Sequence, residues 1–194
     1  MSFSINSDNW LQELEQNDWT LLQLSPDFCT RIQAYARELD QQSCFTPAAL
    51  AEQAHSNIRN DRTFWIQDDT KHPVGIEILH FLDQIKNSLR DYFRISLTHY
   101  ECHLAIFDEG HFYHKHTDQK KTDNHRFFSF VIYLNSDWSD TDGGQLAIYK
   151  DNEPPIFIQP EMPQMIIFKS ELLHEVLVAQ RQRLSLTGWM RTHS

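Results

Sequence analysis

The feature that most constrains the fold of this chain is a series of short strand-like segments in its second half. Residues typical of turns separate these segments, which lie at about 97–107, 111–117, 127–135, 144–149, 155–159, 164–168, 172–178 and 182–190. Many short strands at this spacing are typical of an all-β sandwich or barrel. The sequence therefore predicts a β-barrel in the C-terminal half of the chain.

The N-terminal half contains helical patterns instead. After a predicted strand at 19–24, Ser25 and Pro26 suit the N-cap and the first position of a helix. Apolar residues recur at helical spacing through 26–40 and again through 76–93, which predicts two amphipathic helices. These helices are expected to pack on the barrel and support it.

The length and composition fit one folded domain. The chain has 194 residues, of which 40% are hydrophobic and 12% aromatic, enough to bury a substantial core. It shows no internal repeat and no linker that would mark a second domain. We therefore expect a single domain over 1–194, with a helix-rich support at 1–95 and a β-barrel core at 96–191.

Charge and cysteine usage restrict the partners and the compartment. A formal net charge of −10 argues against nucleic-acid binding, because phosphate contacts need a basic surface. The three cysteines lack a CxxC spacing, which fits a reducing compartment. Neither a signal-peptide pattern nor a run long enough to span a bilayer is visible. We expect a cytoplasmic protein without nucleic-acid or membrane partners, whose oligomeric state is open.

Two candidate metal ligands stand one residue apart in His116-Thr-Asp118. In a strand, residues i and i+2 point to the same face, so this imidazole and carboxylate would lie together. The same alternation places His114 on that face, so spacing leaves His114 open as an alternative ligand. His174 in a later strand offers a third ligand. Two histidines and one carboxylate form the metal-binding face of non-heme Fe(II) oxygenases.

A polar face is predicted on the last strand. Alternation places on it the side chains of Arg183, Ser185, Thr187 and Trp189, with leucines on the opposite face. A buried guanidinium is costly without an anionic partner, and a ligand carboxylate bound through two hydrogen bonds would satisfy it. Thr187 or Tyr133 could donate a further hydrogen bond. The alternative is an exposed face with Arg183 in a surface ion pair.

With these motifs in place, the sequence resembles the Fe(II)/2-oxoglutarate-dependent dioxygenases, particularly the prolyl 4-hydroxylase-like branch. The motifs that carry the resemblance are His116-Thr-Asp118, Phe130-Val-Ile-Tyr-Leu-Asn135, Gly143-Gly-Gln-Leu146, His174-Glu-Val and Arg183-Leu-Ser-Leu-Thr-Gly-Trp189. They follow the family's order over roughly residues 98–191. The resemblance implies a mainly β fold with supporting α-helices, a double-stranded β-helix (jelly roll, cupin-like) with N-terminal helices packed on it.

The resemblance also implies a role for each matching residue. The iron ligands would be His116, Asp118 and His174. Arg183 matches the basic residue that pairs with the distal carboxylate of 2-oxoglutarate, and Tyr133 matches a tyrosine hydrogen-bonded to that carboxylate. Thr187 is a further expected contact with the cosubstrate. The implied cofactors are Fe(II), 2-oxoglutarate and O2, with ascorbate as an optional reductant.

A second resemblance concerns the substrate side of the site. The segment Ile58–Trp65 is similar to one in the oxygen-sensing prolyl hydroxylases and their bacterial counterparts, in which Arg-Gly-Asp is usual where this chain has Arg59-Asn60-Asp61. A tyrosine of many relatives is replaced here by Phe107. On the substrate side we expect Arg59, Asp61, Arg126 and Trp189, with Arg126 pairing with Asp61.

The implied reaction is hydroxylation of a prolyl residue in a protein or peptide, with release of succinate and CO2. Two other functions stay open from the sequence. One is hydroxylation of a small molecule by the same chemistry, and the other is a non-catalytic metal- or ligand-binding barrel. A hydrolytic zinc enzyme would also suit the ligand set, but it would leave Arg183 and Tyr133 without a purpose.

Overall fold

All eight strands predicted in the second half are present in the computed structural model, which describes residues 9–48, 58–119 and 125–193. They are β4 (His99–Phe107), β5 (Tyr113–His116), β6 (Arg126–Tyr133), β7 (Leu146–Tyr149), β8 (Ile156–Ile158), β9 (Gln164–Lys169), β10 (Leu173–Val176) and β11 (Arg183–Arg191). A short 3-10 helix, η1 (Asp140–Asp142), lies in the connection before β7.

The N-terminal half contributes three helices and three further strands. These elements are α1 (Trp10–Asn17), β1 (Trp19–Gln23), α2 (Pro26–Gln41), β2 (Thr46–Pro47), β3 (Arg62–Trp65) and α3 (Pro73–Phe93). The strands β1 and β3 pair with β9 and β4 respectively, so they extend the sheet formed by the second half. The N-terminal half is thus part of the barrel as well as its helical support. None of the described helices is both long and apolar enough to cross a membrane.

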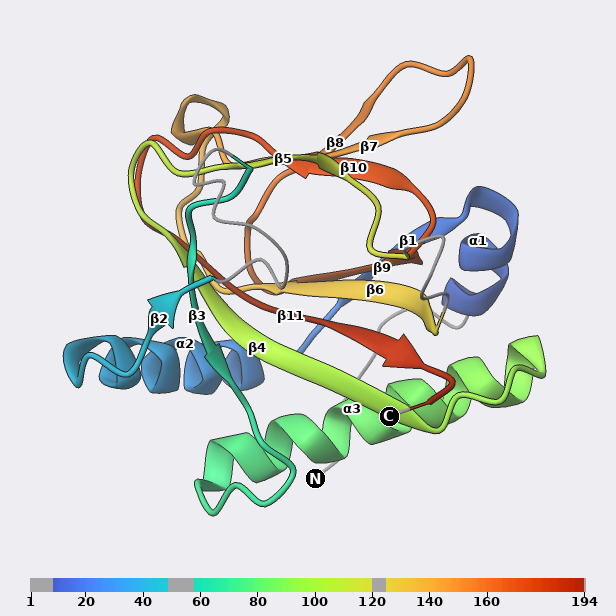
Figure 1. Ribbon diagram of the computed structural model, residues 1–194, viewed down its shortest axis with the longest axis horizontal. Helices are drawn as coiled ribbons and strands as arrows, with labels where there is room; N and C mark the ends of the chain where they lie inside the picture. The colour runs from blue at the N-terminus through green and yellow to red at the C-terminus, as the bar shows by residue number, and fades with distance from the viewer. Residues whose placement is uncertain (1–8, 49–57, 120–124, 194) are drawn as a thin grey trace.

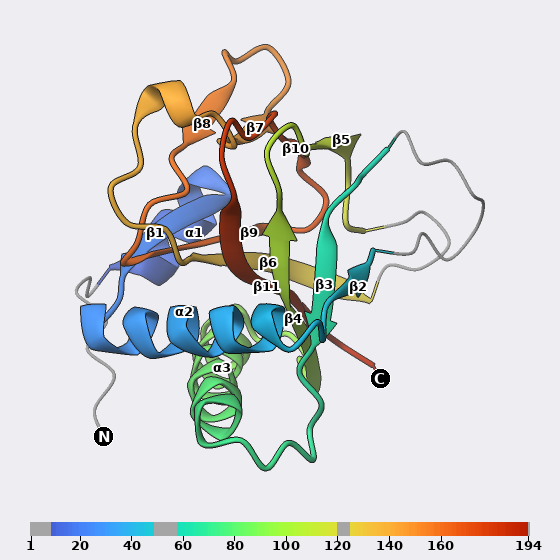
Figure 2. The same cartoon turned by 90° about the vertical axis from the view of Figure 1, so that its left-hand side faces the viewer.

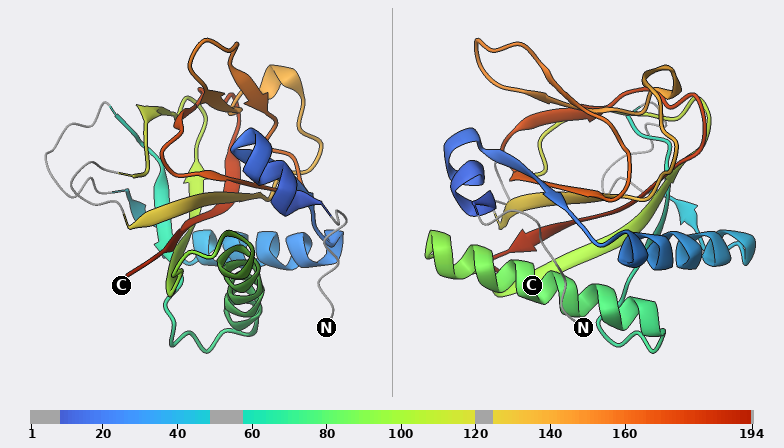
Figure 3. Two further views of the ribbon diagram at one scale, coloured as in Figure 1. Left: turned by 90° about the vertical axis from the view of Figure 1, so that its right-hand side faces the viewer. Right: turned by 180° about the vertical axis from the view of Figure 1, so that it is seen from behind.

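The strands form two facing sheets (Figure 1). The major sheet has the order β1-β9-β6-β11-β4-β3-β2, and the minor sheet has the order β5-β10-β7-β8. Helices α2 and α3 lie against the outer face of the major sheet, away from the minor sheet (Figures 1 and 2). Helix α1 packs beside β1 (Figure 3). This is the expected double-stranded β-helix with helical support.

Strand alternation divides the interior into two clusters. On β4, Cys102, Leu104 and Ile106 pack with the helices, whereas Ala105 and Phe107 belong to the cluster between the two sheets. The two faces of β11 divide in the same way, as predicted, because Leu184 and Leu186 pack with the helices. The space between the sheets is therefore lined by the alternate residues that include the polar face of β11.

Both predicted helices are confirmed; α2 begins at the predicted residue and α3 begins earlier than predicted. Ser25 occupies the N-cap position of α2 and Pro26 follows it, but the Ser25 side chain makes no capping hydrogen bond. Helix α3 starts at Pro73, three residues earlier than predicted. Its N-cap is His72, whose Nδ1 accepts a hydrogen bond from the Val74 amide at 3.3 Å. The sequence did not reveal this cap because histidine is not a preferred N-cap residue.

Asn135 joins the end of β6 to the start of β11. Its Nδ2 donates to the carbonyls of Pro160 and Leu184 at 2.6 and 3.0 Å, and its Oδ1 accepts from the Leu184 amide at 2.7 Å. All three bonds are buried. Because Leu184 directly follows Arg183, this side chain fixes the backbone from which Arg183 projects.

We predict that Asn135→Ala lowers the free energy of unfolding by roughly 2–4 kcal/mol, because it leaves buried backbone groups of Leu184 and Pro160 without partners. Urea unfolding followed by circular dichroism measures the change. The control is Asn87→Ala on the surface of α3, where the amide contacts only Asp83 and Arg90. Equal stability of the two variants would contradict the structural role of Asn135.

Candidate active site

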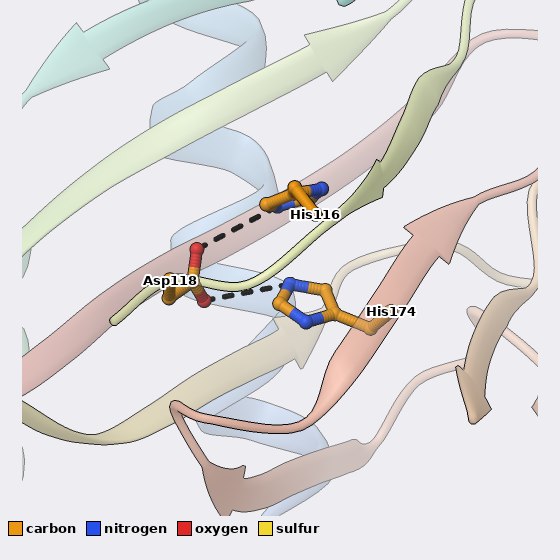
Figure 4. Close-up of side chains that lie close together, drawn as sticks. All are labelled: His116, Asp118 and His174. Carbon is orange, nitrogen blue, oxygen red and sulfur yellow. Dashed lines mark ion pairs between the residues drawn. The ribbon is translucent and has the colours of Figure 1, made fainter. Parts of the chain in front are cut away.

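His116, Asp118 and His174 come together between the two sheets (Figure 4). His116 ends β5 and His174 lies on the neighbouring β10, where the two residues are paired directly across the strands. The Nε2 atoms of His116 and His174 lie 3.6 and 3.4 Å from the two carboxylate oxygens of Asp118. One atom from each side chain lies within 4.8 Å of the others, so the three could share a single metal ion.

The hydrogen bonds of the two imidazoles favour metal binding through Nε2. The Nδ1 atom of His116 lies 2.7 Å from the carbonyl oxygen of His114, and that of His174 lies 2.8 Å from the carbonyl oxygen of Leu172. A carbonyl only accepts, so each Nδ1 donates its proton to that carbonyl, and each Nε2 is left as the nitrogen that can bind a metal ion. This arrangement, in which one ring nitrogen is fixed and the other is free, is typical of metal-ligating histidines.

The alternative ligand, His114, lies outside this cluster. The pairing of β10 with β5 shifts register between His174 and Val176, so that Val176 pairs with Tyr113. This bulge breaks the strict alternation expected from the sequence. His114 is exposed, whereas Tyr113 lines the pocket and its ring stacks on His116 at 3.6 Å between centroids. The i, i+2 spacing therefore wrongly kept His114 as a residue on the same face as His116.

Asp118 is held as a carboxylate by its surroundings. Burial opposes its ionisation, but His174, His116 and the hydroxyl of Ser129 outweigh burial and lower the pKa of Asp118 well below its usual value. The Ser129 hydroxyl donates to Oδ2 at 2.6 Å and lies 2.9 Å from the Ser170 hydroxyl. The Asp118 amide also donates to the Ser170 carbonyl at 3.0 Å, which fixes the backbone.

A buried cation occupies the other end of the same pocket. Arg183 is only 1% exposed, and its guanidinium donates to the Gly144 carbonyl at 2.9 Å and to Ser185 Oγ at 3.3 Å. It forms no ion pair with a carboxylate in the described part of the chain. The rings of Phe107 and Tyr133 lie 5.2 and 5.5 Å from its guanidinium carbon. Phe107 thus contributes an aromatic ring without a hydroxyl at this end of the pocket.

Tyr133 and Thr187 differ in whether their hydroxyls already donate a hydrogen bond within the protein. Tyr133 is fully buried, and its hydroxyl has no hydrogen-bond partner among the described residues. Burial raises the pKa of Tyr133, so the hydroxyl keeps its proton near neutral pH and can donate it. The Thr187 hydroxyl already donates to the Phe130 carbonyl at 3.0 Å. Thr187 lines the pocket but can only accept a further bond.

Arg59 and Asp61 form part of one wall of the pocket. Asp61 is 1% exposed and accepts two hydrogen bonds from Arg59, whose guanidinium also lies 4.6 Å from the Tyr113 ring centroid. The side chain of Asn60 accepts a bond from the Phe112 amide at 2.8 Å. The asparagine that replaces the usual glycine therefore ties this wall to the strand that carries His116.

The expected contact between Arg126 and Asp61 is wrong. Arg126 is the first residue of β6, donates to Glu101 at 2.7 Å, and lies 3.7 Å from the Trp189 ring centroid. Asp61 is instead paired with Arg59 across a two-residue spacing. The sequence did not reveal Glu101 as the partner of Arg126. Glu101 lies on β4, opposite Trp189 on β11.

Three residues of the site, two in the pocket lining and one behind Asp118, were missed in the sequence. Ser129 holds Asp118, Tyr113 packs on His116, and His103 lines the pocket beside Trp189. Alternation along β4 could have placed His103 on the same face as Phe107. No local signal identified Ser129 or Tyr113, because their positions depend on strand pairing and on the bulge in β5.

We predict that Ser129→Ala weakens the affinity for a divalent metal about tenfold, since it removes the hydrogen bond that orients Asp118. Isothermal titration with Mn2+ measures the dissociation constant. Ser88→Ala, on the surface of α3, is the control because its hydroxyl only bonds to Gln84 within the helix. Unchanged metal affinity in Ser129→Ala would show that this bond does not position the carboxylate.

The strand-rich part of the chain matches a known family. Residues 99–191 match the sequence model of the 2OG-Fe(II) oxygenase superfamily. A prolyl 3,4-dihydroxylase of Ostreococcus tauri is 29% identical in an alignment of 108 positions that covers 47% of this chain. The match spans only 20% of the length of that relative.

Two solved structures share most of the fold. The crystal structure of a prolyl-4-hydroxylase from Pseudomonas putida is 31% identical, has a TM-score of 0.87, and covers 95% of this chain and 98% of its own. A prolyl hydroxylase from Trichoplax adhaerens, in complex with a hypoxia inducible factor oxygen degradation domain peptide fragment, is 26% identical with a TM-score of 0.82. It covers 94% of this chain and 87% of its own. Together with the converging ligands, these matches show that the chain belongs to the 2OG-Fe(II) oxygenase superfamily, whose members use Fe(II), 2-oxoglutarate and O2.

Proposed function

We propose that this protein is a prolyl hydroxylase-type dioxygenase that consumes 2-oxoglutarate and O2. The product would be a hydroxylated prolyl residue in a protein or peptide, with release of succinate and CO2. The iron ligands would be His116, Asp118 and His174. Two solved relatives above 25% identity are prolyl hydroxylases, and one of them is in complex with a peptide, which supports this class of substrate.

The observation that carries the proposal is the buried guanidinium of Arg183. Burial lowers the pKa of Arg183, which is the direction expected for a cation that lacks a compensating carboxylate. Such a group is costly unless a ligand supplies the missing anion. A dicarboxylate that reaches from the metal ligands to Arg183 satisfies this requirement, and 2-oxoglutarate is the dicarboxylate of the family.

The other pocket residues would bind the cosubstrate and exclude water. Arg183 and the free hydroxyl of Tyr133 would bind the far carboxylate of 2-oxoglutarate. Apolar side chains between the two ends, including Phe107, Val131 and Leu146, exclude water from the reacting atoms. Bound iron would supply the oxidative chemistry, while the protein fixes the ligands and the orientation of the substrate.

On the substrate side we place Arg59, Asp61, Arg126 and Trp189. All but Arg126 line the pocket, and Arg126 lies against Trp189. The two arginines are neutralised by Asp61 and Glu101, so they shape the pocket wall more than they attract charge. This arrangement suits an uncharged segment of a polypeptide.

We also propose a cytoplasmic location. Cys29 and Cys102 are buried free thiols and Cys44 is partly exposed, a state that a reducing compartment preserves. Burial raises the pKa of Cys29 and of Cys102 to about 12 each, which keeps both thiols protonated. Cell fractionation checks the location, and recovery of the protein outside the cell would contradict it.

The direct test is turnover. Protein purified without oxygen is given Fe(II), 2-oxoglutarate, ascorbate and O2, and succinate is measured. We expect slow succinate formation without substrate and faster formation with a peptide that is hydroxylated. If the protein formed no succinate and did not bind 2-oxoglutarate, the proposal would be wrong, and a non-catalytic barrel would be the better explanation of the fold.

We predict that Arg183→Met raises the dissociation constant of 2-oxoglutarate at least 100-fold, which corresponds to roughly 3 kcal/mol for a buried charged pair. Metal affinity should stay within about twofold of the wild type. Titration of 2-oxoglutarate into the Mn2+-loaded protein measures the effect. The matched control is Arg90→Met, which removes an exposed arginine of α3 that contacts Asp91 and Asn87.

Asp118→Ala should instead weaken the binding of the metal. It removes a ligand, so the affinity for Mn2+ should fall by at least 100-fold, and 2-oxoglutarate binding should be lost with the metal. Metal affinity comes from the same titration. If Arg183→Met weakened the metal and Asp118→Ala spared it, the two ends of the pocket would be wrongly assigned.

A further inference from the structure

A histidine in the pocket has no partner for either of its ring nitrogens. His103 is 2% exposed, and Nδ1 and Nε2 both lack a hydrogen-bond partner among the described residues. The indole Nε1 of Trp189 is also buried without a partner in the same part of the molecule. The two rings lie 5.5 Å apart between centroids, and both line the pocket. Buried polar groups without partners are rare and cost about 1–3 kcal/mol each.

The position of His103 is fixed by three strands. In the register of the major sheet, it lies between Thr187 on β11 and Trp65 on β3. Trp189, two residues beyond Thr187, pairs across the sheet with Ser129, which holds Asp118. His103 and Trp189 therefore lie toward the end of the pocket with the metal ligands, four or more residues along β11 from Arg183.

The arginines near His103 are each paired with a carboxylate. Burial and the nearby Arg59 lower the pKa of His103 to about 3, so its imidazole is uncharged near neutral pH. Arg59 is paired with Asp61, and Arg126 and Arg191 share Glu101. Apart from the metal ligand Asp118, the charged side chain that lacks a partner of opposite charge among the described pocket residues is Arg183, at the opposite end.

We propose that His103 and the indole N–H of Trp189 form a subsite for a backbone amide of the substrate, next to the residue that is hydroxylated. This inference rests on the proposed function and narrows its substrate to a polypeptide rather than a free amino acid. His103 is then a specificity-determining residue of the site.

The hydrogen-bonding capacities match an amide. An indole N–H only donates, and a neutral imidazole offers one donor and one acceptor. An amide carbonyl can accept from both donors, and a neighbouring amide N–H can donate to the remaining nitrogen of His103. Free proline carries an ammonium and a carboxylate, and a neutral buried subsite cannot repay the desolvation of these charges.

Trp65 lies beside this subsite. Its ring lies 4.6 Å from that of His103 and 6.3 Å from that of Trp189, yet Trp65 itself is 42% exposed. Trp65 is thus a large, partly exposed side chain next to the unpartnered nitrogens. A polypeptide bound at this subsite would pack against the exposed part of this indole.

The experiment measures binding without turnover. Mn2+-loaded protein with 2-oxoglutarate is titrated with N-acetyl-L-proline N-methylamide, and in parallel with free L-proline. Broadening of the ligand protons by the bound Mn2+ reports binding close to the metal. We expect the capped amide to bind at least tenfold more tightly than proline. Equal binding of the two probes, or no binding of the amide, would overturn the subsite.

Two substitutions at His103 separate recognition from structure. His103→Phe keeps a ring but removes both nitrogens, so binding of the amide should weaken at least fivefold. The melting temperature should stay equal or rise, because unpartnered buried polar atoms are removed. His103→Asn retains a neutral donor and acceptor and should recover part of the affinity. The control is His99→Phe, an exposed position on the same strand.

The outcomes distinguish this inference from the proposed function. Broadening of 2-oxoglutarate in the same samples reports the cosubstrate site, and its absence in the wild type would count against the proposed function itself. Normal 2-oxoglutarate broadening with unchanged amide binding in His103→Phe would overturn the amide subsite alone. A lowered melting temperature with unchanged amide binding would show that His103 is structural, held by internal water.

Discussion

The pairing of β11 with both of its neighbours is the constraint on which the site depends. All nine residues of this strand pair with β4, and seven of them also pair with β6. A central strand held on both sides cannot slip by one residue without exchanging its two faces. Leucines on one face are buried against the helices, so Arg183 and Trp189 must face the space between the sheets. The cosubstrate end and the substrate end of the pocket are therefore set by one strand.

The distribution of charge makes the two ends of the pocket electrostatically different. In the described part of the chain, the other arginines that are largely buried are each paired with a carboxylate. Arg183 alone among them meets only carbonyl and hydroxyl oxygens. At the opposite end, Asp118 is the buried anion, and two imidazoles face it. A ligand with a carboxylate at one end and metal-binding oxygens at the other fits this polarity.

Much of the fold and the site could be predicted because their signals are local. Short apolar segments separated by turns predicted the eight strands, and helical spacing predicted α2 and α3. The motif around His116 and the face of β11 identified residues that the structure brings into one pocket. The contact between Arg126 and Asp61 was wrong because pairing of side chains from different strands has no local signal. His114 could not be excluded either, since a one-residue bulge in β5 decides which side chains face inward.

The sequence by itself determined the alternation of each strand, the residue types able to bind a metal and a dicarboxylate, and the family to which they correspond. Only the tertiary structure decided which of these groups are left without partners. Ser129 orients Asp118 because its hydroxyl donates a hydrogen bond to the carboxylate, and Asn60 accepts a hydrogen bond from the amide of Phe112. His103 differs from the other buried histidine of the pocket because no carbonyl or carboxylate reaches it. Whether a polar group is satisfied depends on every strand around it, and that information is not present in any single segment of the chain.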